Sequence, residues 1–178
     1  MSKRWLVVNF NNKYFLKVGS KIYGCQIGEG GLIKAVKKTE GDKSTPTGKW
    51  YLKTVFYRSD KVLRPKLKRK NILKIKKITK NCGWCDDIKS NYYNKHIKIS
   101  NFKSPELKYE KLWRKDNAYD IFIEISHNLK PTIRNRGSAV FIHCSFSDKR
   151  KTAGCVALEK KDLFFLLKNV KNNSYIKI

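Results

Sequence analysis

The chain has 178 residues, of which 40% are apolar, and it carries a formal net charge of +27. This apolar content, with nine Phe, nine Tyr and four Trp, excludes a disordered basic tail and indicates a folded protein. No run of 18 apolar residues is present, which excludes a transmembrane helix. The length suits one domain and no repeat or linker divides it, so we expect a single domain over residues 1–178.

The amino-terminal part predicts three β-strands. Trp5–Phe10 and Tyr14–Val18 are expected to form a hairpin, because the pair Asn11-Asn12 between them is a common turn choice. Lys21–Ile27 is expected to be the third strand. The first ten residues lack the apolar region and the cleavage site of a secretory signal, so the chain as written is expected in the cytoplasm.

The middle of the chain combines turn, strand and strongly basic segments. Residues 41–48 have the composition of a turn, and Lys49–Tyr57 alternates as a strand does. Residues 61–80 carry ten Lys or Arg and no acid, with apolar residues between them, a pattern typical of strands and a loop. The basic charge has two open explanations: a lysine bias that covers every solvent face, or a surface that attracts polyanions. Zinc-finger spacing and an RNP-like aromatic pattern are absent, which argues against specific nucleic-acid recognition.

The five cysteines, an odd number, do not form a disulfide framework in a chain of this size. Cys82 and Cys85 make a lone CxxC pair, and no second pair follows at the spacing that a tetrahedral zinc site needs. A redox role would require a strand-to-helix turn at this position, whereas a polar loop follows. We interpret both as structural thiols, with redox activity or metal binding as the alternatives.

The carboxy-terminal half adds strands and one clear helix. Residues 109–114 are expected to form a short helix, and residues 118–126, 139–144 and 174–178 are expected to be strands. Residues 159–169 place apolar side chains at helical spacing and predict an amphipathic helix. The fold class predicted is therefore mainly β with a few short helices.

His143 and Cys155 are the residues best suited to carry chemistry. His143 closes an apolar strand, and the eleven residues that follow it can loop back to bring Cys155 alongside. A thiol is a good nucleophile only after it loses its proton, so a neighbouring imidazole base would activate it. Gly154 removes a side chain from the approach to the thiol, and backbone N–H groups here could stabilise an oxyanion. Basic side chains nearby are expected to lower the thiol pKa, whereas a structural His and a core Cys remain the simpler alternative.

The other candidates for this chemistry are weaker. His96 lies among Lys and Asn residues, and His127 precedes Asn128 at a strand end, where capping of a turn explains it. Cys144 is adjacent to His143 in a strand and should therefore point to the opposite face.

The chain resembles the catalytic domain of the L,D-transpeptidases, the YkuD-type cysteine enzymes of peptidoglycan. The resemblance covers most of the chain and rests on four ordered blocks of residues. These blocks are 27–31 with 40–48; 84–87 with Tyr93-Asn94; 109–110 with 112–114 and 119–120; and 137–143 with 152–158.

The resemblance implies a β-sandwich with the site in a cleft beside the His-bearing strand. Cys155 would attack the carbonyl after the third residue of a tetrapeptide stem and form a thioester. His143 would act as base and then as acid, with its second ring nitrogen oriented by a backbone carbonyl. An amine of a second stem would resolve the thioester into a 3→3 cross-link, whereas water would make the enzyme an L,D-carboxypeptidase. No metal or organic cofactor is implied.

The chain departs from the common family motif beside the nucleophile. That motif places Ser-His before Gly-Cys and an Arg shortly after, whereas Thr152-Ala153 and Val156-Ala157 stand here. We therefore expect Thr152 and Gly154 to contact substrate or oxyanion. Arg114 is expected to meet the substrate carboxylate, with Arg134 and Arg136 as alternatives.

The resemblance also implies a periplasmic or envelope location, in conflict with the missing secretory signal. The partners it implies are peptidoglycan stem peptides, with anionic envelope polymers attracted by the charge of +27. The alternative from another class is a non-catalytic polyanion-binding protein on the same scaffold.

Overall fold

The computed structural model describes residues 4–67, 73–102, 107–171 and 173–178. The described residues form β-strands, one α-helix and two short 3-10 helices, which confirms the mainly β prediction. Their bounds are β1 Arg4–Phe10, β2 Lys13–Val18, β3 Lys21–Gln26, β4 Leu32–Lys34, η1 Ala35–Lys37, β5 Thr45–Thr47, β6 Lys49–Tyr57, β7 Lys74–Lys77, β8 Cys82–Cys85, β9 His96–Lys98, η2 Ile99–Asn101, β10 Tyr109–Lys111, β11 Ile121–Ile125, β12 Phe141–Cys144, β13 Val156–Leu158, α1 Lys160–Lys168 and β14 Tyr175–Lys177.

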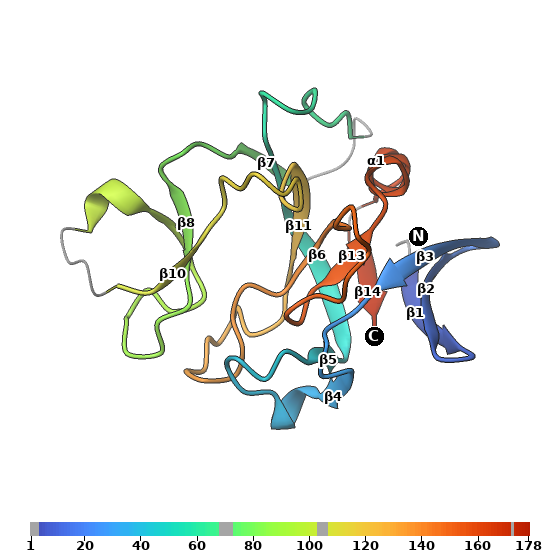
Figure 1. Ribbon diagram of the computed structural model, residues 1–178, viewed down its shortest axis with the longest axis horizontal. Helices are drawn as coiled ribbons and strands as arrows, with labels where there is room; N and C mark the ends of the chain where they lie inside the picture. The colour runs from blue at the N-terminus through green and yellow to red at the C-terminus, as the bar shows by residue number, and fades with distance from the viewer. Residues whose placement is uncertain (1–3, 68–72, 103–106, 172) are drawn as a thin grey trace.

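Nine strands form one curved sheet in the order β11-β12-β13-β3-β2-β1-β14-β6-β7, with β11 also paired to β6 (Figure 1). The predicted hairpin is confirmed: β1 and β2 pair antiparallel, and Asn11 and Asn12 adopt φ of 47° and 59° in the turn. The last strand, β14, pairs parallel with β1, so the two ends of the chain lie on the same part of the sheet.

The sheet separates two hydrophobic cores. On one face α1 packs its predicted apolar stripe, in which Leu163 and Leu167 are buried, against side chains of the sheet that include Ile142. On the other face an aromatic core contains Phe56, Phe122 and further rings that stack or meet edge to face. Because side chains alternate along a strand, consecutive residues of β12 contribute to different cores.

A second sheet of three strands, ordered β10-β8-β9, packs beside the aromatic core (Figure 1). The expectation of a helix over residues 109–114 is wrong, because Tyr109–Lys111 is a strand that pairs antiparallel with β8. Backbone hydrogen bonds to the partner strand stabilise the extended conformation, and a local sequence pattern does not reveal that partner. Cys82 and Cys85 lie in β8, buried and free, and not at the end of a strand before a helix.

Two further segments differ in part from expectation. The segment 41–48 includes β5, which pairs parallel with β4 and so is more than a turn. In the basic segment 61–80, residues 68–72 lie outside the described residues, and β7 is the strand found in the described remainder. None of the helices in the described part of the chain is long and apolar enough to cross a membrane.

Candidate active site

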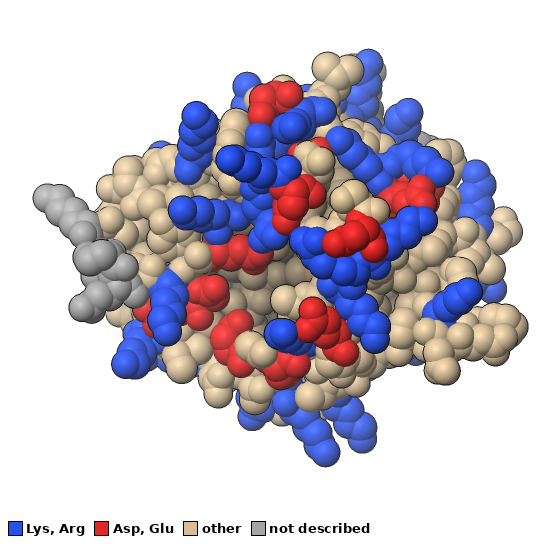
Figure 2. All heavy atoms as spheres, in the orientation of Figure 1, with Lys and Arg blue, Asp and Glu red and all other residues tan. Residues whose placement is uncertain are grey.

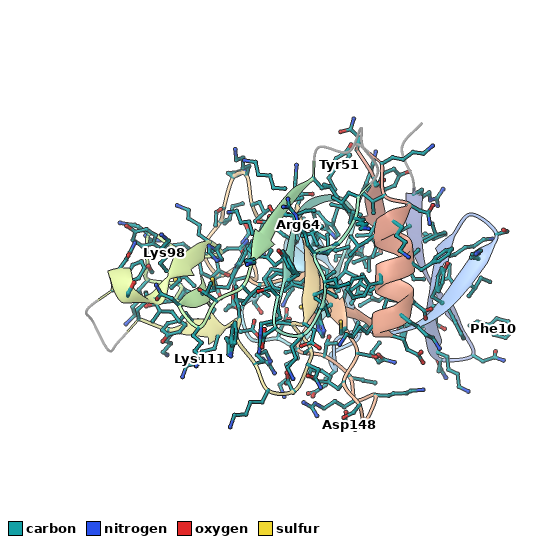
Figure 3. The ribbon with its side chains drawn as sticks, turned by 90° about the horizontal axis from the view of Figure 1, so that it is seen from above. Phe10, Tyr51, Arg64, Lys98, Lys111 and Asp148 are labelled. Carbon is teal, nitrogen blue, oxygen red and sulfur yellow. The ribbon has the colours of Figure 1, made fainter. Side chains whose placement is uncertain are left out.

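His143 and Cys155 lie on neighbouring strands and on the same face of the sheet. Strand β12 carries His143 and pairs parallel with β13, with His143 opposite Ala157. Cys155 stands two residues before Ala157, so its side chain points to the same face as the imidazole. The loop between the two strands, whose outer part Asp148 marks in Figure 3, therefore returns the chain to the histidine.

The imidazole of His143 is held by its surroundings on the aromatic face. Nδ1 lies 2.7 Å from the Cys144 carbonyl oxygen, which can only accept, so Nδ1 carries the proton and Nε2 has a free lone pair. The ring meets Tyr119 and Phe146 edge to face, at centroid distances of 5.4 and 5.8 Å. Burial lowers the pKa of His143 to about 4, so the ring is neutral at pH 7.

Cys144, next to His143, belongs to the core on the opposite face, as its position in the strand predicts. Its thiol donates to the Ile121 carbonyl oxygen at 3.5 Å.

The thiol of Cys155 is buried and bonded to the chain that leads into β12. It accepts the Phe141 N–H at 3.2 Å and donates to the Ala139 carbonyl oxygen at 3.1 Å. Burial raises its pKa to about 12, and the charge of Glu110 acts in the same direction. The Phe141 N–H, Lys38 and Arg114 act in the lowering direction, but burial outweighs them. The basic side chains therefore lower the pKa of the thiol as expected, but burial outweighs them, and the resting pair is a neutral thiol beside a neutral imidazole.

Thr152 and Gly154 shape the loop that presents the thiol. The Thr152 hydroxyl donates to the Cys155 carbonyl oxygen at 2.6 Å and accepts the Gly154 N–H at 3.1 Å. Gly154 has φ of +134°, and a Cβ there would lie 3.0 Å from the Ser44 carbonyl oxygen. Only glycine fits this conformation and this close approach readily. Thr152 is thus a structural support of the nucleophile loop.

A cavity of about 450 Å³ opens over these residues. Its walls include His143, Cys155, Thr152, Gly154 and Arg114, so the structure brings every predicted site residue to one cavity. A larger hollow of about 770 Å³ lies near β6 and β7, but its described lining contains neither cysteine nor histidine. The smaller cavity is therefore the candidate active site, because it contains the predicted nucleophile and base.

Comparison with known protein families matches residues 3–178 to the L,D-transpeptidase catalytic domain, YkuD. The chain belongs to this family. No curated protein sequence and no solved structure matched it. The resemblance expected from four blocks of sequence is confirmed, and it covers nearly the whole chain.

Arg114 lines the cavity of this YkuD domain but is already paired with carboxylates. Its Nε and Nη2 donate to Asp116, and its Nη1 donates to Glu110 at 3.1 Å. The alternatives, Arg134 and Arg136, bond to Asn91 and to the Val36 carbonyl oxygen and do not line the cavity. Of the three arginines considered, Arg114 alone is placed to meet a ligand there.

Sequence reasoning missed Lys38 as a cavity residue. The residue is 3% exposed, and its side chain forms an ion pair with Asp42. Among 41 basic residues, nothing in the sequence distinguishes Lys38 as one that the fold buries beside the cavity. The carboxylates of Glu40, Asp86 and Glu110 also line the cavity, and they lie in the quoted blocks without having been given roles.

The remaining histidines lie away from the thiol. Nε2 of His127 is 3.0 Å from the Arg136 carbonyl oxygen, and the ring of His96 packs on Phe56. In the described parts of the chain, no group of three or more His, Cys, Asp or Glu side chains is arranged to hold a metal ion.

Proposed function

We propose that this YkuD domain is a cysteine acyltransferase that acts on peptidoglycan stem peptides as an L,D-transpeptidase. The observation that carries the proposal is the placement of Cys155 and His143 on one face, in one cavity, with Nδ1 of the imidazole tied to a carbonyl. Membership of the family supplies the substrate class. Action on this substrate would place the enzyme in the periplasm or cell envelope.

In the first step, Nε2 of His143 takes the thiol proton while Sγ of Cys155 attacks the carbonyl after the third stem residue. A C–S bond forms and the carbonyl oxygen becomes an oxyanion. Because the Thr152 hydroxyl occupies the Gly154 N–H, the Cys155 N–H is the donor proposed for this oxyanion. The C–N bond then breaks, the leaving amine takes the proton from the imidazole, and a thioester remains.

In the second step, an amine of another stem attacks the thioester carbon. His143 accepts the amine proton and returns a proton to the departing sulfur, so the thiol is restored and an amide has formed. This product is a 3→3 cross-link. Hydrolysis by water in the same step would instead release a shortened stem, which is the L,D-carboxypeptidase reaction.

The proposal is tested by incubating the protein with a carbapenem and mapping the adduct by mass spectrometry. We expect one adduct, on Cys155, and none in Cys155→Ala. Cys25→Ala is the matched control, because Cys25 is a buried thiol in β3 outside the cavity, and it should keep the adduct. An unmodified wild type would refute the enzyme and favour a polyanion-binding protein on this scaffold.

Purified sacculi then separate the two reactions of the thioester. Accumulation of 3→3 dimers identifies a transpeptidase, and accumulation of tripeptide stems identifies a carboxypeptidase. If neither product forms but the protein binds anionic polymers with steep salt dependence, the positive surface is its function.

A further inference from the structure

Five neighbouring strands of the large sheet contain no acidic residue. They lie in the order β3-β2-β1-β14-β6, and each carries Lys or Arg but neither Asp nor Glu. All 14 acidic residues of the chain therefore lie elsewhere. Figure 2 shows acidic side chains around a hollow near the middle of the molecule, whereas the end that β1–β3 form in Figure 1 has uncharged and basic surface. The fold thus gathers strands of one sign of charge into one surface.

These five strands are covered by the protein on one side. That side carries Trp5, Val7 and Leu16 into the core that α1 also enters. The side chains that alternate with them point the other way, and neither hydrophobic core of the described residues includes them. We call this second side the outer face, and its members considered below include Leu6, Phe10, Lys17, Ile22, Lys49 and Lys177.

The strand register places lysines and apolar side chains next to each other on the outer face. Lys49 pairs with Lys177, and Lys177 pairs with Leu6. Leu6 pairs in turn with Lys17, and Lys17 pairs with Ile22. This row crosses all five strands and is about 19 Å long, because neighbouring strands lie about 4.8 Å apart.

The lysines of this row have no internal counter-charge. Among the described residues, no ion pair includes Lys17, Lys49 or Lys177. Like charges directly opposite one another on paired strands, as at Lys49 and Lys177, are destabilising. An anionic partner on the outer face would remove this repulsion.

The outer face also exposes large apolar side chains. Phe10 is 69% exposed and Ile22 is 60% exposed. Tyr51 and Tyr175 meet edge to face at 6.2 Å, and Nζ of Lys49 lies 4.4 Å from the centroid of the Tyr175 ring. Lysines beside exposed aromatic and aliphatic side chains are typical of surfaces that enter the headgroup region of a membrane. Charge alone would not require the apolar members.

We propose that the outer face docks on a membrane surface rich in anionic phospholipids. The lysines contact headgroup phosphates, while Phe10 and Ile22 enter the boundary between headgroups and acyl chains. A second copy of the chain fits this face less well, because an isologous contact would set lysines against lysines. The face lies at the end of the molecule away from β8 and β10 (Figure 1), and Glu110 of β10 lines the cavity, so docking leaves that wall of the cavity free. The inference goes beyond the proposed reaction and does not depend on it.

Binding is measured by sedimentation of the full chain with vesicles at physiological ionic strength. Vesicles that contain phosphatidylglycerol should bind the protein, and vesicles of phosphatidylcholine alone should not. The double variant Lys17→Gln/Lys177→Gln should bind at least tenfold more weakly, since each basic residue near such a surface is worth about fivefold in affinity. Lys98→Gln/Lys111→Gln is the matched control, because both lysines are exposed on the three-stranded sheet at the other end of the molecule (Figure 3), and it should bind as the wild type does.

A second pair of substitutions separates a membrane from a soluble polyanion. Phe10→Ser/Ile22→Ser should weaken binding to the phosphatidylglycerol vesicles at least fivefold and leave binding to soluble polyphosphate unchanged. Thermal melts establish that each variant is folded.

Four results would overturn the proposal. The first is equal binding to both kinds of vesicle, and the second is an equal loss of binding in the control variant. Wild-type vesicle binding by the apolar double variant would assign the face to a soluble polyanion. A wild-type dimer in analytical ultracentrifugation that this variant dissociates would assign it to a second copy. Cys155→Ala should bind vesicles as the wild type does, so failure of vesicle binding rejects this inference alone, and failure to form a carbapenem adduct rejects the proposed reaction alone.

Discussion

Gly28 supports the nucleophile loop from outside the catalytic residues, and Gly28→Ala tests this support. A Cβ at residue 28 would lie 2.1 Å from the Lys43 carbonyl oxygen and 3.0 Å from Gly154 Cα. The backbone of Gly28 is tied down, because its N–H donates to Thr45 Oγ1 at 2.8 Å. Relief of the overlap therefore requires a shift of about 1 Å in the packed neighbours, one of which is the residue before Cys155.

We expect this shift to cost about 1–3 kcal/mol of stability, as overpacking does, and to lower Tm by about 2–4 °C per kcal/mol in a chain of this size. Displacement of the thiol by about 1 Å should slow acylation by a carbapenem about a hundredfold. The assays are a thermal melt and the rate of adduct formation on Cys155. Gly24→Ala is the control, because a Cβ there has nothing within 4 Å, and it should leave both unchanged. Acylation of Gly28→Ala at the wild-type rate would refute the reasoning.

Three further predictions concern the site and its titration. Thr152→Val removes the donor to the Cys155 carbonyl oxygen and the acceptor of the Gly154 N–H, and it should lower the free energy of unfolding by about 1–3 kcal/mol in a thermal or urea melt. Thr152→Ser keeps both hydrogen bonds and is the control. Equal stability of the two variants would contradict this prediction. Because burial holds the pKa of Cys155 near 12, the rate of its alkylation by iodoacetamide should rise with pH without a plateau up to pH 9, and a plateau near neutrality would show a thiolate–imidazolium pair instead. Burial lowers the pKa of His143 and of His127 to about 4, so protonation of either ring favours the unfolded chain. Each neutral ring contributes fully to the free energy of unfolding above pH 6.5, and that contribution falls by about 3 kcal/mol as the pH falls toward 4. Urea melts of the wild type and of His127→Gln should show a smaller loss in the variant, and parallel curves would contradict the assignment.

Local sequence patterns predicted the elements whose conformation is set by the residues within the element itself. The hairpin at Asn11-Asn12 follows from two residues that tolerate positive φ, and α1 follows from an apolar stripe at helical spacing. Tyr109–Lys111 was wrongly expected to be helical because its conformation is set by pairing with β8, which lies more than twenty residues earlier in the chain. A segment of three residues carries too little pattern to reveal such a partner.

The sequence by itself determined the candidate nucleophile and base, because Cys155 and His143 stand in ordered blocks that resemble the family whose model matches residues 3–178. Only the tertiary structure decided which charges face them. Lys38, Glu40, Asp86 and Glu110 come from segments spread over more than seventy residues, and the fold brings the loop after η1 and the sheet β10-β8-β9 to one cavity. Burial there also decided the protonation of the pair, since removal from water favours the neutral thiol and the neutral imidazole, and the degree of burial is a property of the packed chain.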